Sequence, residues 1–147
     1  MKIVICASTA FSDKILEVEG ELKKMGHDIS IPYFSNLFKE KKLDFEKYKK
    51  DKEKEGDTKY RQEYRDQVDL VKRYYKLIGE SDAVLVLNCK KNEIENYIGG
   101  SVLMEMGFAY VLDKKIYLLN DIPKMQYIDE IIAAKPVVIH GDLSKIK

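Results

Sequence analysis

The chain has 147 residues, of which 45% are hydrophobic and 35% are charged, and its formal net charge is +1. This length suits one domain over residues 1–147 with a core of its own. A nucleic-acid-binding protein would carry a basic excess, which this composition lacks. No apolar run reaches the roughly 18 residues that a membrane span needs, and no signal-peptide core follows Met1. We therefore expect a cytoplasmic protein that binds neither nucleic acid nor membrane.

The first 32 residues predict a strand, a helix and a second strand. Residues 2–6, "KIVIC", form a short apolar run that is typical of a buried parallel strand. Residues 13–26 carry apolar side chains at helical spacing, with Ser12 as the expected N-cap and Gly26 as the expected residue after the C-cap. The stretch "HDISIP" predicts the second strand, which ends at Pro32 because proline cannot continue a strand ladder.

Residues 39–66 are rich in lysine and glutamate, but leucine, phenylalanine and tyrosine interrupt the charges. We interpret this segment as a charged helical insertion after the second strand, or as a lid. Apolar and tyrosine residues step by three and four over residues 58–79. That spacing predicts one long amphipathic helix whose tyrosine stripe packs mostly into the core.

Strands and helices alternate in the rest of the chain. We expect strands over residues 82–88, 114–120 and 136–140, a helix over residues 101–113 and a short helix within residues 121–135. This alternation predicts an α/β fold with a five-stranded parallel sheet. The expected strand order is 2-1-3-4-5, as in flavodoxin-like and Rossmann-like proteins, with right-handed crossovers.

Ligands of such sheets bind at the point where the strand order reverses, beyond the carboxyl ends of the strands. The loop after the first strand and the loop after the third strand converge there. Their candidate ligand-binding residues are Ala7, Ser8, Thr9, Asn88, Gly99, Gly100 and Ser101. Hydroxyls and backbone amides before a helix suit a phosphate or a sugar hydroxyl, and glycines allow close approach to the backbone. Asn88 has the alternative role of closing a turn.

Glu105 is a carboxylate within the apolar run "GGSVLMEMGFAYVL" of residues 99–112. The helix N-terminus would help to keep this carboxylate ionised, and a partly desolvated carboxylate suits nucleophilic attack or general-base work. A structural glutamate that pairs with a lysine or a backbone amide is the alternative. We expect no metal, because the two cysteines and two histidines lack ligand spacing. We also expect no cofactor, since neither a dinucleotide-binding nor a P-loop glycine motif is present.

Three stretches, "KIVICAST", "SDAVLVLN" and "GGSVLMEMGFAYVLDKKIYLL", resemble the nucleoside 2-deoxyribosyltransferase family, which includes the 2′-deoxynucleoside 5′-phosphate N-hydrolases. The resemblance covers nearly the whole chain apart from residues 39–66, and "EMGFAYVLDKKI" is its most specific part. It implies that Glu105 is a nucleophile that attacks the anomeric carbon of a nucleoside or nucleotide substrate. The glycosyl-enzyme then passes its sugar to a base or to water.

The chain departs from the family at four helper positions, where it has Val4, Ala10, Tyr74 and Gly99. The resemblance aligns Tyr74 with an aspartate of the active site, so that either Tyr74 or Tyr75 replaces this aspartate or the chemistry has changed or been lost. It also implies a homodimer or higher homo-oligomer in which Tyr127 or Asp129, after the fourth strand, binds substrate of a neighbouring subunit. Because the family's residues at these four positions are missing, a second hypothesis is a nucleotide-binding or sensor module that does not turn its ligand over.

Overall fold

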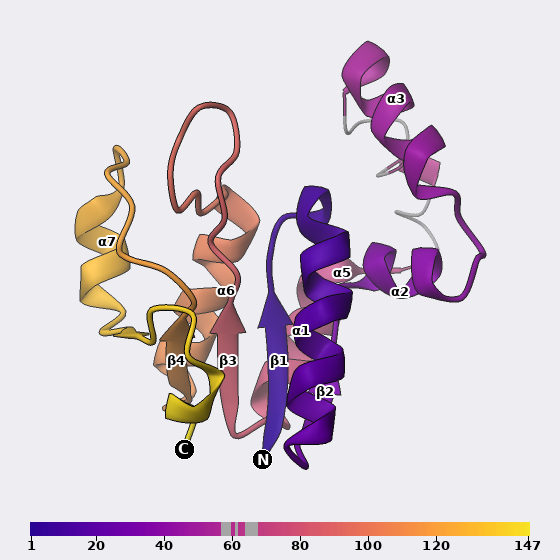
Figure 1. The fold of residues 1–147 in the computed structure, drawn as a ribbon. Helices are drawn as coiled ribbons and strands as arrows, with labels where there is room; N and C mark the ends of the chain where they lie inside the picture. The colour runs from indigo at the N-terminus through magenta and orange to yellow at the C-terminus, as the bar shows by residue number, and fades with distance from the viewer. Residues whose placement is uncertain (57–59, 61, 64–67) are drawn as a thin grey trace.

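The computed structural model describes residues 1–56, 60, 62–63 and 68–147. A five-stranded sheet with the order β2-β1-β3-β4-β5 lies at its centre (Figure 1), and every neighbouring pair of strands is parallel. The strands are β1 (Lys2–Cys6), β2 (Asp28–Ser30), β3 (Ala83–Val86), β4 (Lys115–Leu118) and β5 (Val137–Val138). The predicted α/β fold and its strand order are confirmed.

Helices cover both faces of this sheet (Figure 1). The helices and 3-10 turns are η1 (Thr9–Phe11), α1 (Ser12–Lys24), α2 (Tyr33–Lys39), α3 (Phe45–Glu55), α5 (Leu70–Gly79), α6 (Gly100–Val111), α7 (Ile128–Ala133) and η2 (Leu143–Lys145). The helix α1 and the C-terminal turn η2 lie on one face, and α5, α6 and α7 lie on the other. Within the described part of the chain, no helix has the length and apolarity that crossing a bilayer requires.

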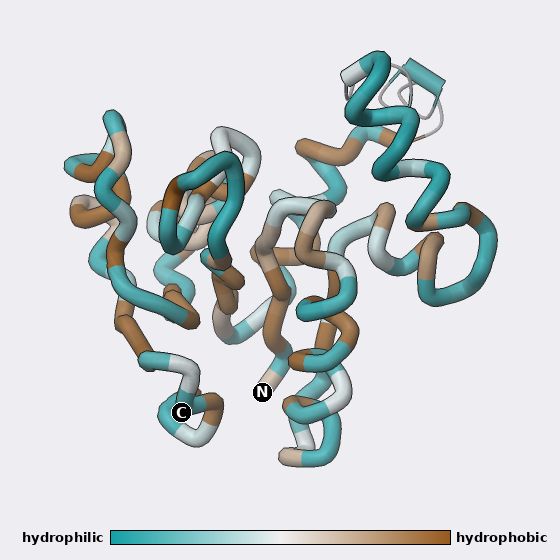
Figure 2. The backbone as a smooth tube through the Cα atoms, turned by 45° about the horizontal axis from the view of Figure 1, so that its top comes forward, coloured by the Kyte–Doolittle hydropathy of each residue, from teal (hydrophilic) through white to brown (hydrophobic). Residues whose placement is uncertain are grey.

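Side chains of successive strand residues alternate between two cores, as the period of a β-strand requires. On β1, Ile3 and Ile5 pack with α1, whereas Val4 and Cys6 pack with α5 and α6. The strands appear as apolar segments in the centre of the molecule, while α3 is hydrophilic along most of its length (Figure 2). Cys6 therefore ends its strand on the face that also carries α6.

The helix α1 begins one residue earlier than predicted. Its N-cap is Phe11, and Ser12 is its first residue, so the prediction of Ser12 as N-cap is wrong. The reason is that η1 runs directly into α1, and Ser8 caps η1 by accepting a hydrogen bond from the Ala10 amide. The other end is as predicted, because Gly26 follows the C-cap with a φ of 87°, a conformation that glycine adopts without strain.

The predicted continuous helix over residues 58–79 is wrong, because α5 begins only at Leu70. Asp69 has an extended conformation, and its carboxylate accepts a hydrogen bond from the Lys72 amide at 3.0 Å. An aspartate that caps a helix in this way ends any helical run before it. Tyr64 of the predicted stripe lies outside the described residues, and Tyr75 is half exposed at 51%.

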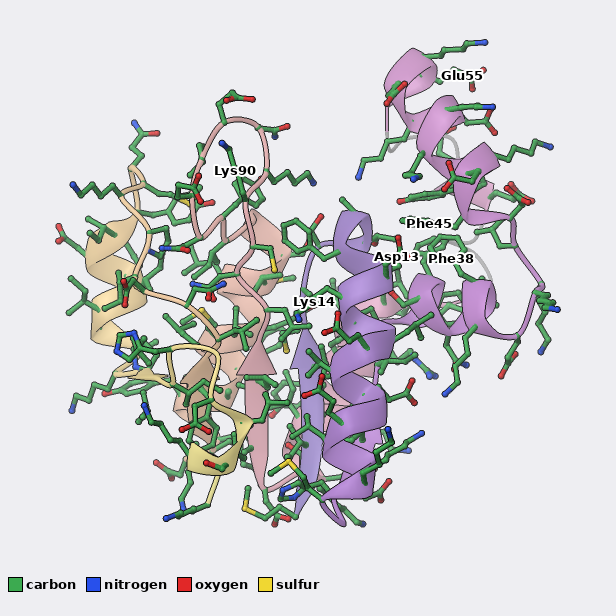
Figure 3. The ribbon with its side chains drawn as sticks, viewed as in Figure 1. Asp13, Lys14, Phe38, Phe45, Glu55 and Lys90 are labelled. Atoms are coloured by element: carbon green, nitrogen blue, oxygen red, sulfur yellow. The ribbon has the colours of Figure 1, made fainter. Side chains whose placement is uncertain are left out.

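Within the charged insertion of residues 39–66, α3 is helical, as predicted, while residues 40–44 form a non-helical connection from α2. Phe45 and Tyr48 of α3 contact Phe38 of α2, and Glu55 points outward at the other end of α3 (Figure 3). The ring centroids of Phe38 on α2 and Phe45 on α3 lie 4.9 Å apart. The alternative interpretation as a lid stays a prediction.

Candidate active site

A cavity of about 630 Å³ opens at the carboxyl ends of β1 and β3, where the strand order reverses. This volume is in the usual range of small-molecule sites. The sequence-predicted residues that line it are Ala7, Ser8, Thr9, Tyr74, Gly99, Gly100, Ser101 and Glu105. Three segments far apart in the sequence, around residues 7–9, 74 and 99–105, thus meet at one place.

Glu105 is the sixth residue of α6 and lines this cavity, with only 8% of its surface exposed. Burial raises the pKa of its carboxyl to about 7, although a hydrogen bond with the Cys6 side chain lowers it in part. The expectation that the start of α6 keeps Glu105 ionised is therefore wrong. The unpaired amides belong to the first turn of a helix, and Glu105 lies beyond that turn.

Cys6 is the hydrogen-bond partner of Glu105 and is completely buried at the end of β1. Burial raises the pKa of its thiol, and the neighbouring Glu105 raises it further, so Cys6 is a neutral S–H donor at neutral pH. Composition alone would class Cys6 as a small apolar core residue. Cys6 could be identified from the sequence by its position as the last residue of a strand that ends where the strand order reverses.

Tyr74 is buried on α5 and lies on the same side of the sheet as Glu105. Burial raises the pKa of its hydroxyl well above the usual value, and the charge of Glu105 raises it further. A hydrogen bond from the Tyr33 amide acts in the opposite direction but does not offset them. Tyr74 is thus a protonated hydroxyl beside Glu105, where it can donate a hydrogen bond.

Lys91 belongs to the loop after β3 and connects it to the loop after β1. The ammonium group of Lys91 lies 2.9 Å from the Ser8 hydroxyl and 5.3 Å from the centre of the Tyr97 ring. All three residues line the cavity, so they combine a cation, a hydroxyl and an aromatic ring in one wall. Lys91 and Tyr97 belong to the loop that the topology predicts at the site, but nothing in their spacing distinguishes them from other loop residues.

The two glycines before Glu105 have different roles. A side chain at Gly99 would bring a Cβ atom to 3.3 Å from the Tyr97 ring, so glycine at this position allows the ring to pack against the backbone. A Cβ atom at Gly100 would meet nothing within 4 Å. Gly99 is the N-cap of α6 and offers no side-chain cap. The first backbone amides of α6 therefore lie beside the cavity without a capping side chain.

Two predicted binding residues lie elsewhere. Asn88 is fully buried and does not line the cavity, because its amide group donates to the Asn120 and Asp121 carbonyls and accepts from the Asn120 amide. It closes the turns after β3 and β4, so its prediction as a substrate ligand is corrected. Tyr127 also lies outside the cavity lining, and its hydroxyl donates to the Ile98 carbonyl.

The far wall of the cavity comes from α2 and from the insertion of residues 39–66, and no sequence argument named its residues. Its cavity-lining rings are Tyr33, Phe34, Tyr48 and Tyr60, and we call these four residues the aromatic wall. Lys52, one helical turn after Tyr48, also lines the cavity. The available sequence signal was the aromatic residues that interrupt the charged segment, but their spacing does not show which side they face.

Comparison of the chain with protein-family models, with curated proteins and with solved structures found no match.

Proposed function

We propose that this chain cleaves or transfers the N-glycosidic bond of a nucleoside or a nucleoside 5′-monophosphate, with Glu105 as the nucleophile. The proposal rests on one observation: the buried carboxyl group of Glu105 lines a cavity at the edge of the sheet where the strand order reverses. Ionisable groups with strongly shifted pKa values in clefts are enriched at functional sites. The resemblance to nucleoside 2-deoxyribosyltransferases independently assigns the nucleophile to the same residue.

In the proposed reaction, a carboxylate oxygen of Glu105 forms a bond to C1′ of the sugar. The C1′–N bond breaks, and its electron pair leaves with the base, which takes up a proton from solvent. Water or an acceptor base then attacks C1′ and loses a proton to solvent, and the Glu105 carboxylate is released with its electron pair. Only the ionised form of Glu105 can attack, so its pKa of about 7 predicts that the rate rises with pH through the neutral range.

The groups around Glu105 suit the other parts of such a substrate. Lys91, Ser8 and Thr9 provide a cation and hydroxyls for a 5′-phosphate or a 5′-hydroxyl. The backbone at Gly99 and Gly100 provides amide donors on the same side. The Tyr74 hydroxyl, which stays protonated, takes the helper role and donates a hydrogen bond beside the reacting carbon.

We also propose that the chain acts as a homodimer through the exposed apolar faces of α5 and α6. These faces carry Val71, Tyr75, Met104 and Val111, each at least 39% exposed. Val71 and Met104 also line the cavity, so the apolar surface continues to its rim. A second copy that covers this surface would lie next to the substrate.

The test is incubation of the purified chain with deoxynucleosides, ribonucleosides and their 5′-monophosphates, with released base measured by chromatography. We expect base release from at least one substrate. Glu105→Gln should lower the rate by about a hundredfold or more, since the amide is a poor nucleophile. Glu95→Gln is the matched control, because Glu95 is an exposed carboxylate on the loop before α6 and does not line the cavity.

Equal rates for Glu105→Gln and the wild type would contradict the proposed nucleophile. Thermal stabilisation by a nucleotide that is never cleaved would contradict the proposed reaction and favour the sensor module. The raised pKa and the burial of Glu105 would then reflect only a buried structural position.

A further inference from the structure

A second cavity, of about 530 Å³, opens at the opposite edge of the sheet from the cavity at Glu105. Lys115 and Val137, the first residues of β4 and β5, line this second cavity, and we call it the amino-edge cavity. Its volume is in the usual range of small-molecule sites. Among the described residues, the two cavities share no lining side chain. What binds the amino-edge cavity therefore does not depend on the function proposed for Glu105.

The lining of the amino-edge cavity is positively charged. Asp113 is the single carboxylate that lines it among the described residues, against four lysines. These are Lys114, Lys115, Lys135 and Lys145. The whole chain, in contrast, has a formal net charge of only +1. A cleft whose charges are mostly of one sign concentrates its electrostatic field and attracts ions of the opposite sign.

Three of these lysines are in a position to bind an anion. Lys114 follows α6, Lys135 follows α7 and Lys145 belongs to η2, so three segments far apart in the sequence line one cavity. Within the described part of the chain, none of the three forms an ion pair. Lys115 is different, because it donates a hydrogen bond to the main-chain oxygen of Lys147 at 2.6 Å.

Two neighbouring groups modify the positive charge without cancelling it. The Lys135 ammonium group lies 5.9 Å from the centre of the Tyr110 ring, which is 45% exposed and also lines the cavity. Hydrogen bonds from Ser144 lower the pKa of the Asp142 carboxyl, and the charge of Lys145 lowers it further. Asp142 does not line the cavity, and its carboxylate accepts hydrogen bonds from both the amide and the hydroxyl of Ser144.

Lys135 occupies a position where glycine would be less strained. It follows the C-cap of α7 with a φ of 50°, in the left-handed region. The residue at the equivalent position after α1 is Gly26, with a φ of 87°. A residue with a Cβ atom adopts this conformation at a cost in free energy that glycine does not have. A lysine at this turn therefore lowers stability relative to glycine, which favours a binding role for its side chain.

We propose that the amino-edge cavity binds a small anion with two or more phosphate groups, held by Lys114, Lys135 and Lys145. Hydrogen bonds from ammonium groups to phosphate oxygens are strong because donor and acceptor are both charged. An anion with several phosphate groups carries enough negative charge to offset three cations. The same phosphate chain occurs in inorganic polyphosphate and in nucleotides.

Isothermal titration calorimetry of the full chain with sodium tripolyphosphate and with ATP, in the absence of divalent metal, tests the site. At about 150 mM NaCl we expect a Kd of about 100 µM or tighter for at least one of the two. Higher salt should weaken this binding, because it screens the lysine charges. Tighter binding of ATP would assign the nucleotide as the source of the phosphate chain, and equal or weaker binding would assign the inorganic anion.

Substitutions separate these lysines from other surface cations. Lys135→Gly should weaken binding about tenfold, as expected for loss of one charge-assisted hydrogen bond. Its melting temperature should equal or exceed that of the wild type, because glycine adopts the left-handed φ without strain. Lys114→Gln should weaken binding by a similar factor. Lys124→Gln is the matched control, because Lys124 is exposed and lines neither cavity, and its Kd should stay within about twofold of the wild type.

Three results would overturn the site. The first is wild-type binding weaker than about 100 µM for both anions, and the second is an equal loss in Lys135→Gly and Lys124→Gln. The third is binding that Lys91→Gln removes and Lys135→Gly retains, because that binding would belong to the cavity at Glu105. Base release by the chain is a separate measurement, so this site and the proposed function fail independently.

Discussion

At the scale of single residues, the site depends on a carboxyl that the fold keeps out of water. Burial of Glu105 favours its neutral form, and the Cys6 side chain is the hydrogen-bond partner that acts in the opposite direction. The sequence predicts a functional role for Glu105 because a carboxyl group within an apolar helix is costly to bury. It does not predict Cys6, because the partner of a buried group depends on which face of a strand meets which helix.

Replacement of Cys6 tests this pairing. Cys6→Ala removes a hydrogen bond that favours the charged carboxylate, so the pKa of Glu105 should rise further above about 7. The rising limb of the pH–rate profile should shift to higher pH by the same amount. Infrared titration of the carboxyl band, with Glu105→Gln as the blank, measures the same shift without turnover.

Cys6→Ser is the matched control, since serine keeps a donor of similar size, and its profile should stay close to that of the wild type. An unchanged infrared midpoint in Cys6→Ala would show that the thiol does not affect the ionisation of Glu105.

At the scale of elements, the strands and a helical insertion could be predicted, whereas α2 and the place where the insertion packs could not. Each strand has a local apolar signal, whereas the start of α5 depends on one cap at Asp69. The position of α2 depends on contacts across 20 or more residues, such as that of Glu19 on α1 with Lys39 on α2 at 2.7 Å. Long-range contacts of this kind leave no periodicity in the sequence. The aromatic wall therefore had to be found in the structure.

Loss of the Glu19 carboxylate should destabilise the fold. Burial raises the pKa of Glu19, but hydrogen bonds from Lys23 and Lys39 outweigh burial, and the net pKa is lowered. The stabilisation is therefore present above the unfolded-state value of about 4.5 and is lost as the pH falls through the folded-state value. Glu19→Gln should lower the free energy of unfolding at pH 7 by about 1–2 kcal/mol, measured by urea titration.

The difference between Glu19→Gln and the wild type should shrink when the titration is repeated at about pH 3. Glu17→Gln is the control, because Glu17 pairs with Lys14 at the surface of the same helix, and it should change stability by less than about 0.5 kcal/mol. A Glu19→Gln difference that is the same at both pH values would exclude the ion pairs as its cause.

At the scale of the whole molecule, the order 2-1-3-4-5 brings the loops after β1 and β3 to one edge. That part of the site follows from topology and could be predicted from the strand signals alone. The opposite wall and the apolar outer faces of α5 and α6 depend on helix orientation. The sequence predicted a core role for Tyr75, which is instead half exposed on the face proposed for dimer contact.

The dimer proposal predicts a specific effect of surface charge. Tyr75→Lys places a cation in the α5–α6 face and should convert a dimer into a monomer in sedimentation velocity. Ile132→Lys on α7 is the matched control, since Ile132 is also 51% exposed but is outside that face. A wild type that sediments as a monomer, or equal dissociation by both variants, would rule out the α5–α6 interface.

The central claim is that the Glu105 carboxylate forms a bond to the sugar, and intact-mass spectrometry of an acid-quenched reaction tests it most directly. The account predicts a protein species heavier by one glycosyl group, with the added mass mapped by peptide fragmentation to Glu105 and absent in Glu105→Gln. Base release with no adduct at Glu105, or with an adduct on another residue, would contradict it.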